Sequence, residues 1–399
     1  MSEWVIRRIE DVAQVFDGPH ATPKKTQSGP WFLSISSLDH GRLNLEDSAH
    51  LSEEDFTRWT RRVTPKPGDV LFSYETRLGD AALMPEGVRA CLGRRMGLLR
   101  PNKEVVDPRF LLFAYLSPEF QETIQSRKIH GATVDRIPLV DLPRWPIRIP
   151  ALLEQQAVAA ILGGLDDKIA VNERIAITYE QILQLHFDDL GIVGESSIGD
   201  AITASEIIEF NPKTLKPSNK KAVYVDMSTL STRRAGIQTW TYREPKSGTR
   251  FLNGDTLLAR ITPCLENGKA GFVDFMSEGE VGVGSTEFIV MRSRSDIPSE
   301  LTYFLARNER FRAHAVRNMV GSSGRQRVSA ASLAGFLVNR PTDEALTNFG
   351  AAASKIFVHM KSLENESRTL AALRDALLPQ LMSGRLRVRD AEHIVEDAL

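Results

Sequence analysis

Residues 150–190 read PALLEQQAVAAILGGLDDKIAVNERIAITYEQILQLHFDDL, and this stretch decides the fold. One set of positions recurs in alternating steps of four and three residues, which places them in a stripe along one face of a helix. The stripe consists of Val158, Leu162, Leu165, Ile169, Asn172, Ala176, Tyr179 and Leu183. Alternating steps of this kind are typical of a coiled-coil seam. The stretch therefore predicts a long helix that packs against a partner helix.

A second stretch, which begins at Pro341, carries the same stripe at the offset that separates Pro150 from Pro341. Its members are Phe349, Ala353, Ile356, Met360, Leu363, Ser367, Leu370, Arg374 and Leu377. We predict that the two helices pair, most simply antiparallel, through Val158, Leu162, Leu165, Ile169, Tyr179, Leu183, Phe349, Ile356, Met360, Leu363, Leu370 and Leu377. The polar members Asn172, Ser367 and Arg374 then fix the register. The alternative is two separate amphipathic helices, each lying on its own domain. Gly163-Gly164 marks either a close helix approach or a weak point.

Working outward, the segments before the two stretches also repeat, with short matches in the same order. Residues 67–71 (PGDVL) correspond to 253–257 (NGDTL), and residues 33–38 (LSISSL) correspond to 225–230 (VDMSTL). Further matches pair residues 79–81 with 268–270, residues 107–108 with 297–298, and residues 131–133 with 321–323. Ordered matches over such a length indicate an internal duplication.

Each copy mixes short β-like runs with turn residues, which predicts a globular α/β (α+β) domain. We expect strands at 70–74, 98–99, 223–227 and 288–291, and one short helix near 108–125 or 298–315. The predicted fold is thus two pseudo-symmetric domains separated by two long helices that pair as an antiparallel coiled coil. The predicted boundaries are 1–149 and 191–340 for the domains, 150–190 and 341–390 for the helical regions, and 391–399 for a C-terminal tail.

Composition narrows the classes of protein. The 399 residues include 42% hydrophobic and 25% charged residues, ordinary values for a globular chain. No run of residues is apolar enough for a membrane helix, and the N-terminus lacks the apolar core of a signal peptide. The two cysteines, Cys91 and Cys264, form no disulfide framework. We therefore expect a cytoplasmic protein. Because 50 Lys and Arg balance 51 Asp and Glu, any nucleic-acid binding requires local basic surfaces.

Motifs that carry chemistry are missing from the sequence. It contains no P-loop, no HExxH and no zinc spacing among its eight histidines. Glu280–Gly284 (EVGVG) lacks the strand-then-helix context of a cofactor loop, and Pro245 argues against a nuclease strand at Glu244–Lys246. We therefore interpret the chain as non-catalytic, with no cofactor or metal of its own.

Basic, hydrogen-bonding loops remain as candidate functional features. Arg binds guanine or phosphate, Lys binds phosphate and Gln pairs with adenine, so these residue types suit the reading of a DNA duplex. The candidates are Lys24, Lys25, Arg61, Arg62, Arg77, Arg94 and Arg136 in the first copy, and Lys220, Lys221, Arg233, Arg260, Arg325, Gln326 and Arg327 in the second. Solvated surface charge is the competing interpretation for each one. Gly321–Arg327 (GSSGRQR) is the strongest single case.

With these features the chain resembles the specificity subunits of type I restriction–modification systems, over almost its whole length. The resemblance rests on residues 150–156 (PALLEQQ), 165–169 (LDDKI) and 377–388 (LLPQLMSGRLRV), with Trp4 and residues 9–12 (IEDV) as the opening and 198–201 (IGDA) as its counterpart. Residues 342–345 (TDEA) depart from the family by lacking the Glu-Gln pair, and residues 17–23 only approximate its N-terminal motif.

The resemblance implies a subunit that binds double-stranded DNA and two methyltransferase subunits, with restriction subunits added in the full complex. S-adenosylmethionine, ATP and Mg²⁺ would be used by those partners, and no membrane is involved. Each domain would read one half of a two-part target, and the helices would act as spacer and docking surface.

Two other interpretations stay open. One is a specificity subunit of a fused, type IIB-like restriction–methylation enzyme, which the neighbouring genes would distinguish. The other is a scaffold that binds protein instead of DNA, which predicts no salt-dependent binding of a duplex. A cryptic enzyme is disfavoured because the matched positions are mainly glycine, proline and apolar residues.

Overall fold

The computed structural model describes residues 4–39, 41–45, 48–131, 134–194, 201–322 and 324–397. The chain forms two compact units, one of residues 1–169 with 368–399 and one of residues 170–367. The long helices α5 (Leu152–Asp189) and α9 (Asp343–Met382) contribute to both units. The sequence matches at 132–133, 198–200 and 323 lie outside the described residues.

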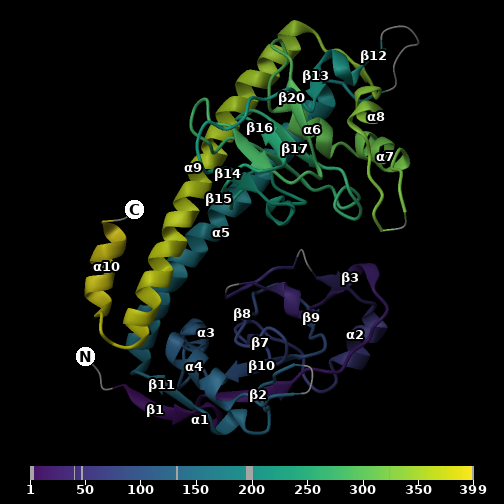
Figure 1. The fold of residues 1–399 in the computed structure, drawn as a ribbon. Helices are drawn as coiled ribbons and strands as arrows, with labels where there is room; N and C mark the ends of the chain where they lie inside the picture. The colour runs from purple at the N-terminus through teal and green to yellow at the C-terminus, as the bar shows by residue number, and fades with distance from the viewer. Residues whose placement is uncertain are drawn as a thin grey trace. The chain divides into compact units, whose positions relative to one another are not determined.

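Unit 1 is built on a four-stranded antiparallel sheet in the order β2–β10–β7–β8 (Figure 1). Its strands are β2 (Ala13–Asp17), β7 (Val70–Ser73), β8 (Ala81–Leu83) and β10 (Met96–Pro101). Successive side chains of a strand point to opposite faces. Val70 and Phe72 accordingly join one hydrophobic cluster and Leu71 joins another. The apolar run at 70–72 is therefore a strand buried on both faces.

Smaller elements complete unit 1. The strands are β1 (Val5–Arg8) paired with β11 (Pro146–Ile149), β3 (Thr26–Phe32) between β6 (Ala49–His50) and β9 (Ala90–Cys91), and β4 (Leu38–Asp39) paired with β5 (Arg42–Leu43). The helices are α1 (Ile9–Val12), α2 (Glu53–Trp59), α3 (Pro108–Leu116), α4 (Pro118–Arg127) and the C-terminal α10 (Val388–Glu396), with 3₁₀ turns η1 (Ile35–Ser37) and η2 (Leu142–Arg144).

Unit 2 repeats this plan. Its central antiparallel sheet has the order β13–β20–β17–β18, formed by β13 (Ile208–Phe210), β17 (Thr256–Ala259), β18 (Ala270–Phe272) and β20 (Phe288–Ser293). Two further sheets are β12 (Ala201–Thr203) with β21 (Leu337–Asn339), and β15 (Thr241–Arg243)–β14 (Ala222–Val225)–β19 (Gly282–Gly284)–β16 (Thr249–Phe251). The helices are α6 (Leu301–Arg307), α7 (Glu309–Arg317) and α8 (Ala330–Ala334), with 3₁₀ turns η3 (Ala204–Glu206) and η4 (Met227–Thr229).

A buried ion pair occupies the same place in both central sheets. Asp69, which precedes β7, binds Arg100 of β10 at 2.7 Å. Asp255, which precedes β17, binds Arg292 of β20 at 2.7 Å. Together with the shared strand order, these pairs confirm the internal repeat that the sequence predicts.

The single short helix expected near 108–125 or 298–315 is wrong, because two consecutive helices occupy each of these stretches, α3 and α4 in one copy and α6 and α7 in the other. Ser117 is extended between α3 and α4, since the residue before a proline avoids helical geometry, and its hydroxyl accepts a hydrogen bond from Phe120 N. Asn308 has the same role between α6 and α7, where its side chain accepts hydrogen bonds from Arg310 N and Phe311 N. From the sequence, the two helices of each copy look like one continuous helix, so the caps at Ser117 and Asn308 were not predicted.

The two long helices pack against each other in antiparallel orientation, as predicted (Figure 1). In unit 1 the hydrophobic core holds Leu162 and Leu165 from the early part of α5 and Leu377 from the late part of α9. In unit 2 the core combines Leu183 from the late part of α5 with Phe349 from the early part of α9. Full burial of such side chains contributes roughly 1.5–3 kcal/mol each, so the seam is a main source of stability.

The glycine pair of α5 has a different neighbour from the one expected. A Cβ added at Gly163 would lie 2.6 Å from Nη1 of Arg109, which belongs to α3, and one at Gly164 would meet open space. The close approach at Gly163 is thus to a side chain of α3, a helix of the globular domain, and not to the paired helix α9.

Candidate nucleic-acid interface

One edge of the central sheet of unit 1 gathers several polar side chains. Here β2 and β7 end, β10 begins, and a loop of residues 129–136 returns to the sheet. Three backbone hydrogen bonds hold the edge together: Gly18 N to Met96 O (3.0 Å), Tyr74 N to Arg95 O (3.0 Å) and Ile137 N to Tyr74 O (2.9 Å). Asp17, Tyr74, Arg95 and Arg136 are therefore brought to one edge from four distant segments.

The structure brings some of the first-copy candidates together at this edge. Lys25 and Arg94 line one open groove of about 630 Å³, together with Arg95. Arg77 lines a second open groove of about 520 Å³, which the 129–136 loop also borders. Its guanidinium pairs with Asp80 and donates hydrogen bonds to the carbonyls of Ile35 (3.4 Å) and Leu38 (3.2 Å), which fixes it between the two grooves.

The other candidates of this copy have different surroundings. Arg136 ends the 129–136 loop, where its backbone pairs with Ile129 and Glu75. Arg62 is exposed, and its Nη1 lies 3.6 Å from Asp17 Oδ2. Lys24 is exposed between the groove residues Pro23 and Lys25 but does not itself line the groove, and Arg61 is exposed on a segment that lines neither groove.

Unit 2 has an equivalent edge with different side chains. Arg260 follows β17 and Glu287 precedes β20, and a hydrogen bond of 3.0 Å from Arg260 N to Glu287 O takes the place of the Tyr74–Arg95 bond. The loop of residues 320–327 returns here as the 129–136 loop does in unit 1, through Val328 N and Arg260 O (3.0 Å). This edge collects Arg260, Arg325, Gln326 and Arg327, four of the second-copy candidates.

The remaining second-copy candidates lie on other segments. Lys220 and Lys221 are exposed directly before β14. Arg233 is exposed in the loop after η4, and its backbone N–H donates to Ser231 Oγ at 3.0 Å.

The two edges differ in the ionisation state of the side chains that they present. In unit 2, the hydrogen bonds from Arg327 hold the pKa of Glu287 below its usual value, and Arg260 adds to this effect by its positive charge. In unit 1, burial raises the pKa of Tyr74 to about 12, and the negative charge of Asp17 acts in the same direction. Glu287 thus stays ionised and Tyr74 stays a neutral donor at any physiological pH.

Three of these edge residues, Asp17, Tyr74 and Glu287, are absent from the candidates predicted from the sequence, because only cations and amides were considered. Asp17 ends β2, and its Oδ1 atom is buried with no hydrogen-bond partner among the described residues. Glu287 holds Arg327 in place. Their position directly at strand ends in both copies of the repeat is the signal that could have identified them.

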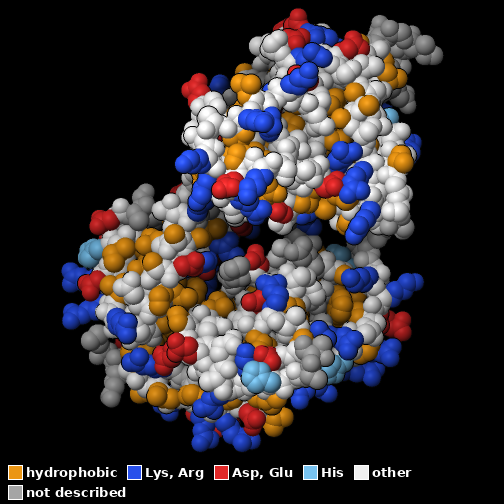
Figure 2. All heavy atoms as spheres, in the orientation of Figure 1, with side chains coloured by type: hydrophobic (Ala, Val, Ile, Leu, Met, Phe, Trp, Pro, Cys, Tyr) orange, Lys and Arg blue, Asp and Glu red, His pale blue; other side chains and the backbone are white. Residues whose placement is uncertain are grey.

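The face of the molecule drawn in Figure 2 is mixed in charge. Figure 2 shows Lys and Arg side chains interspersed with acidic and hydrophobic ones over the face in view. Within the described ranges, no three His, Cys, Asp or Glu side chains form a group able to hold a metal ion. No helix in the part of the chain that the structure describes has the length and apolar character needed to cross a bilayer.

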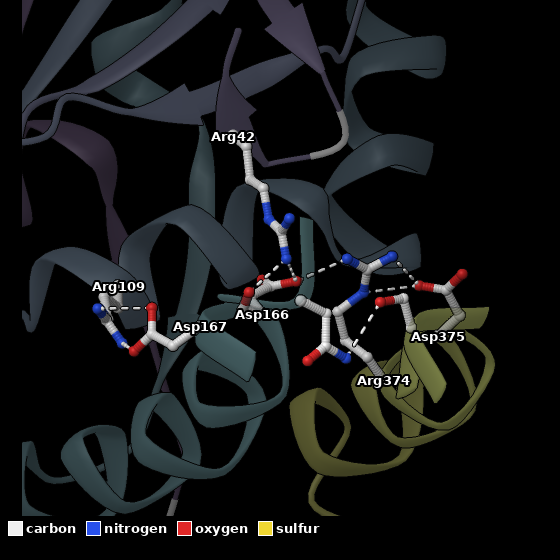
Figure 3. A network of polar contacts seen from close by, with 8 residues as sticks. Arg42, Arg109, Asp166, Asp167, Arg374 and Asp375 are labelled. Atoms are coloured by element: carbon white, nitrogen blue, oxygen red, sulfur yellow. Dashed lines mark hydrogen bonds and ion pairs between the residues drawn. The ribbon is translucent and has the colours of Figure 1, made fainter. Parts of the chain in front are cut away.

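A polar network attaches the globular domain of unit 1 to the helix pair (Figure 3). Asp166 of α5 accepts a hydrogen bond of 2.7 Å from Arg374 of α9, and Arg42 of β5 contacts both its carboxylate and its carbonyl. The next residue of α5, Asp167, pairs with Arg109 of α3 at 2.8 Å. These contacts connect four separate elements of unit 1, namely β5, α3, α5 and α9.

The globular domain of unit 2 is attached to helix α5 through a largely buried carboxylate, that of Glu180. Glu180 of α5 accepts hydrogen bonds from Ala235 N (2.7 Å) and from the Tyr303 hydroxyl (3.2 Å). Burial raises the pKa of Glu180 to about 7, although these hydrogen bonds and the nearby Arg307 and Arg234 act in the opposite direction.

The predicted seam residues are mostly buried. Val158, Leu162, Leu165, Ile169, Leu183, Phe349, Met360, Leu363, Leu370 and Leu377 are buried, and Tyr179 and Ile356 are partly exposed. The polar positions contact each other within unit 2: Asn172 Nδ2 donates to Glu366 Oε2 (2.7 Å) and to Ser367 Oγ (3.3 Å). A register shift would break these bonds, so they specify the alignment of the helices.

Comparisons with known proteins agree with this architecture. Residues 1–181 match the family model described as the type I restriction modification DNA specificity domain. The type I restriction enzyme EcoEI specificity subunit of Escherichia coli is 32% identical over 207 residues, which are 49% of this chain and 34% of that protein. The EcoAI specificity subunit of the same organism is 35% identical over 134 residues, 32% of this chain and 22% of that protein. The chain thus spans about a third or less of the length of these curated relatives.

A solved structure shares the fold. The crystal structure of the type-I restriction-modification system S subunit from M. genitalium aligns with a TM-score of 0.55, over 95% of this chain and 96% of that one. The two sequences are 14% identical, so this similarity concerns the arrangement of elements alone.

Proposed function

We propose that the chain is a specificity subunit of a type I restriction–modification system, whose family model residues 1–181 match, and that it selects the DNA sequence on which such a system acts. It does so by binding double-stranded DNA, with residues 1–149 reading one half of a two-part target and residues 191–340 reading the other. The helical regions 150–190 and 341–390 dock the partner subunits, and residues 391–399 follow them.

One observation carries this proposal. Two domains with the same strand order present hydrogen-bonding side chains at the same sheet edge, yet the side chains differ: Tyr74 and Arg95 in unit 1 correspond to Arg260 and Glu287 in unit 2. A shared scaffold with exchanged donors and acceptors is what the reading of two different base sequences requires, because each base pair has its own pattern of donors and acceptors in the major groove.

The proposed partners are two methyltransferase subunits, joined by restriction subunits in the complete enzyme, all acting in the cytoplasm. S-adenosylmethionine, ATP and Mg²⁺ belong to those partners, and the role of this chain is non-catalytic. Near-neutral net charge is compatible with such an assembly if the partners provide many of the phosphate contacts.

Genome-wide mapping of adenine methylation tests the proposal. Cells that carry this chain and the methyltransferase expressed with it should show a two-part methylated motif, and deletion of the chain should abolish it. Methylation that continues unchanged without the chain would exclude DNA selection and favour a protein-binding scaffold.

A further inference from the structure

The arginines at the sheet edge of unit 2 differ in how many of their donors the protein itself uses. Arg327 uses three of its five N–H donors within the chain: Nε donates to Glu287 Oε2 (2.8 Å), Nη2 donates to Glu287 Oε1 (2.8 Å) and Nη1 donates to the Arg325 carbonyl (3.2 Å). The Nε and Nη2 edge of its guanidinium is thus held on a carboxylate, which fixes the orientation of the side chain.

The guanidinium of Arg260, unlike that of Arg327, has a buried donor that the described part of the chain does not use. Its backbone is fixed on both sides, since its N–H binds Glu287 O and its carbonyl accepts from Val328 N, each at 3.0 Å. Its Nε atom is buried and finds no hydrogen-bond partner in the described part of the chain. A buried donor without a partner costs free energy, so such a group in a native structure points to a water, an ion or a ligand that satisfies it.

Backbone hydrogen bonds hold Gln326 and Arg327 beside Arg260. Thr262 N donates to the Gln326 carbonyl (3.1 Å) and Gln326 N donates to Thr262 Oγ1 (3.1 Å), while the backbone of Arg327 pairs with Ile261. The ion pair between Arg327 and Glu287 ties the end of the loop to the start of β20. Gln326 and Arg327 are therefore tied to the sheet edge, and a held geometry of this kind is a requirement for distinguishing base edges.

We propose that Arg260 is the residue of unit 2 that reads a guanine, through its N7 and O6 acceptors, and that Arg327 with Glu287 is a positioning pair that holds the 320–327 loop. This proposal rests on the proposed function and assigns different roles to two arginines that the sequence cannot tell apart. Guanine is chosen because a planar guanidinium matches its two adjacent acceptors, and because a site that leaves a buried donor unpaired rejects bases that lack them.

Methylome sequencing of variants tests both roles in cells that contain the full chain and its methyltransferase. In Arg260→Ala, we expect discrimination for guanine at one position of the half-target read by unit 2 to fall by roughly tenfold to a hundredfold, with the other half unchanged. In Arg327→Gln, we expect the motif to stay the same while the methylated fraction of its sites falls. Lys246→Ala removes an exposed cation of the same domain and is the matched control.

The positioning role has its own readout. Glu287→Gln alone should lower the methylated fraction about as much as Arg327→Gln, and the double variant should lower it no further, because both changes break one pair. Additive losses would show that Arg327 contacts DNA directly, and an Arg260→Ala chain that keeps its motif at a lower level would show a phosphate contact; either result overturns the assignment.

The experiment separates this inference from the proposed function. If the wild-type chain directs no two-part motif, the proposed function fails before any variant is compared. Where the wild-type motif is present, an unchanged base preference in Arg260→Ala refutes the inference alone. Thermal unfolding of each purified variant verifies that it is folded, and Arg260→Lys gives a second test if alanine destabilises the domain, since lysine keeps the charge but loses the planar fork.

Discussion

At the scale of single residues, the two central sheets each depend on one buried ion pair. Only 2% of the Asp69 side chain and 1% of the Asp255 side chain are exposed, and each carboxylate also accepts a backbone N–H, from Lys66 (2.8 Å) and Leu252 (2.7 Å). Arg100 or Arg292 would remain largely desolvated if its partner were removed.

We therefore expect Asp69→Ala and Asp255→Ala each to lower the free energy of unfolding by roughly 3–5 kcal/mol. Glu10→Ala, which removes an exposed partner of Arg8, should cost less than about 1 kcal/mol and is the control. Urea unfolding measures all three. Equal, small effects would mean that the pairs are not part of the stabilising core.

Glu180 makes the stability of unit 2 depend on pH. Its pKa is about 7 in the folded chain because burial disfavours the charged form, whereas the ordinary value is 4.5. The folded state therefore binds the proton more tightly than the unfolded state. The resulting stabilisation is complete below pH 4.5 and is lost as the pH rises to about 7, with a total of about 3 kcal/mol at most.

Glu180→Gln tests this dependence, because glutamine has nearly the same shape and does not titrate. Between pH 4.5 and 7, the stability of the wild-type chain relative to this variant should decline, and above pH 7 the variant should be the more stable one. Urea unfolding at several pH values gives the comparison. Parallel curves for the two chains would contradict the assignment of a raised pKa to Glu180.

At the scale of elements, Asp166 and Asp167 are adjacent in sequence but differ in surroundings. Asp166 is 15% exposed and bridges Arg42 and Arg374, whereas Asp167 is 60% exposed in its pair with Arg109. Asp166→Ala should thus cost roughly 2–3 kcal/mol, since Arg374 keeps Asp375 as a second partner, and Asp167→Ala should cost less than about 1 kcal/mol. Thermal unfolding of the two variants measures both losses of stability. A larger loss in Asp167→Ala than in Asp166→Ala would contradict this account.

The elements also show how far the sequence alone could lead. The four-and-three spacing predicted both long helices and their pairing, because that spacing directly sets which side chains share a face. The strands at 70–74 and 288–291 followed from apolar runs. The break at Ser117 was missed because the flanking apolar residues continue the helical pattern through it.

The polar contacts were beyond sequence reasoning for a different reason. Arg42, Asp166 and Arg374 meet only after the chain has folded, and no spacing rule connects positions so far apart. Likewise, the candidate arginines were identified by residue type alone. Arg327, which Glu287 holds, and Arg260, whose buried Nε atom has no hydrogen-bond partner among the described residues, therefore looked equivalent. Asp17 was missed because an acidic acceptor does not appear in a search for basic patches.

At the scale of the whole molecule, the central claim is that each domain reads its own half of one target. The measurement that tests it most directly is adenine-methylome sequencing of cells carrying a chain in which residues 1–149 are replaced by a second copy of residues 191–340. If each domain reads independently, the half of the motif read by unit 2 is retained and the other half is replaced by a second, inverted copy of it. A motif that keeps its original two halves, or methylation that no longer depends on the chain at all, would contradict the claim.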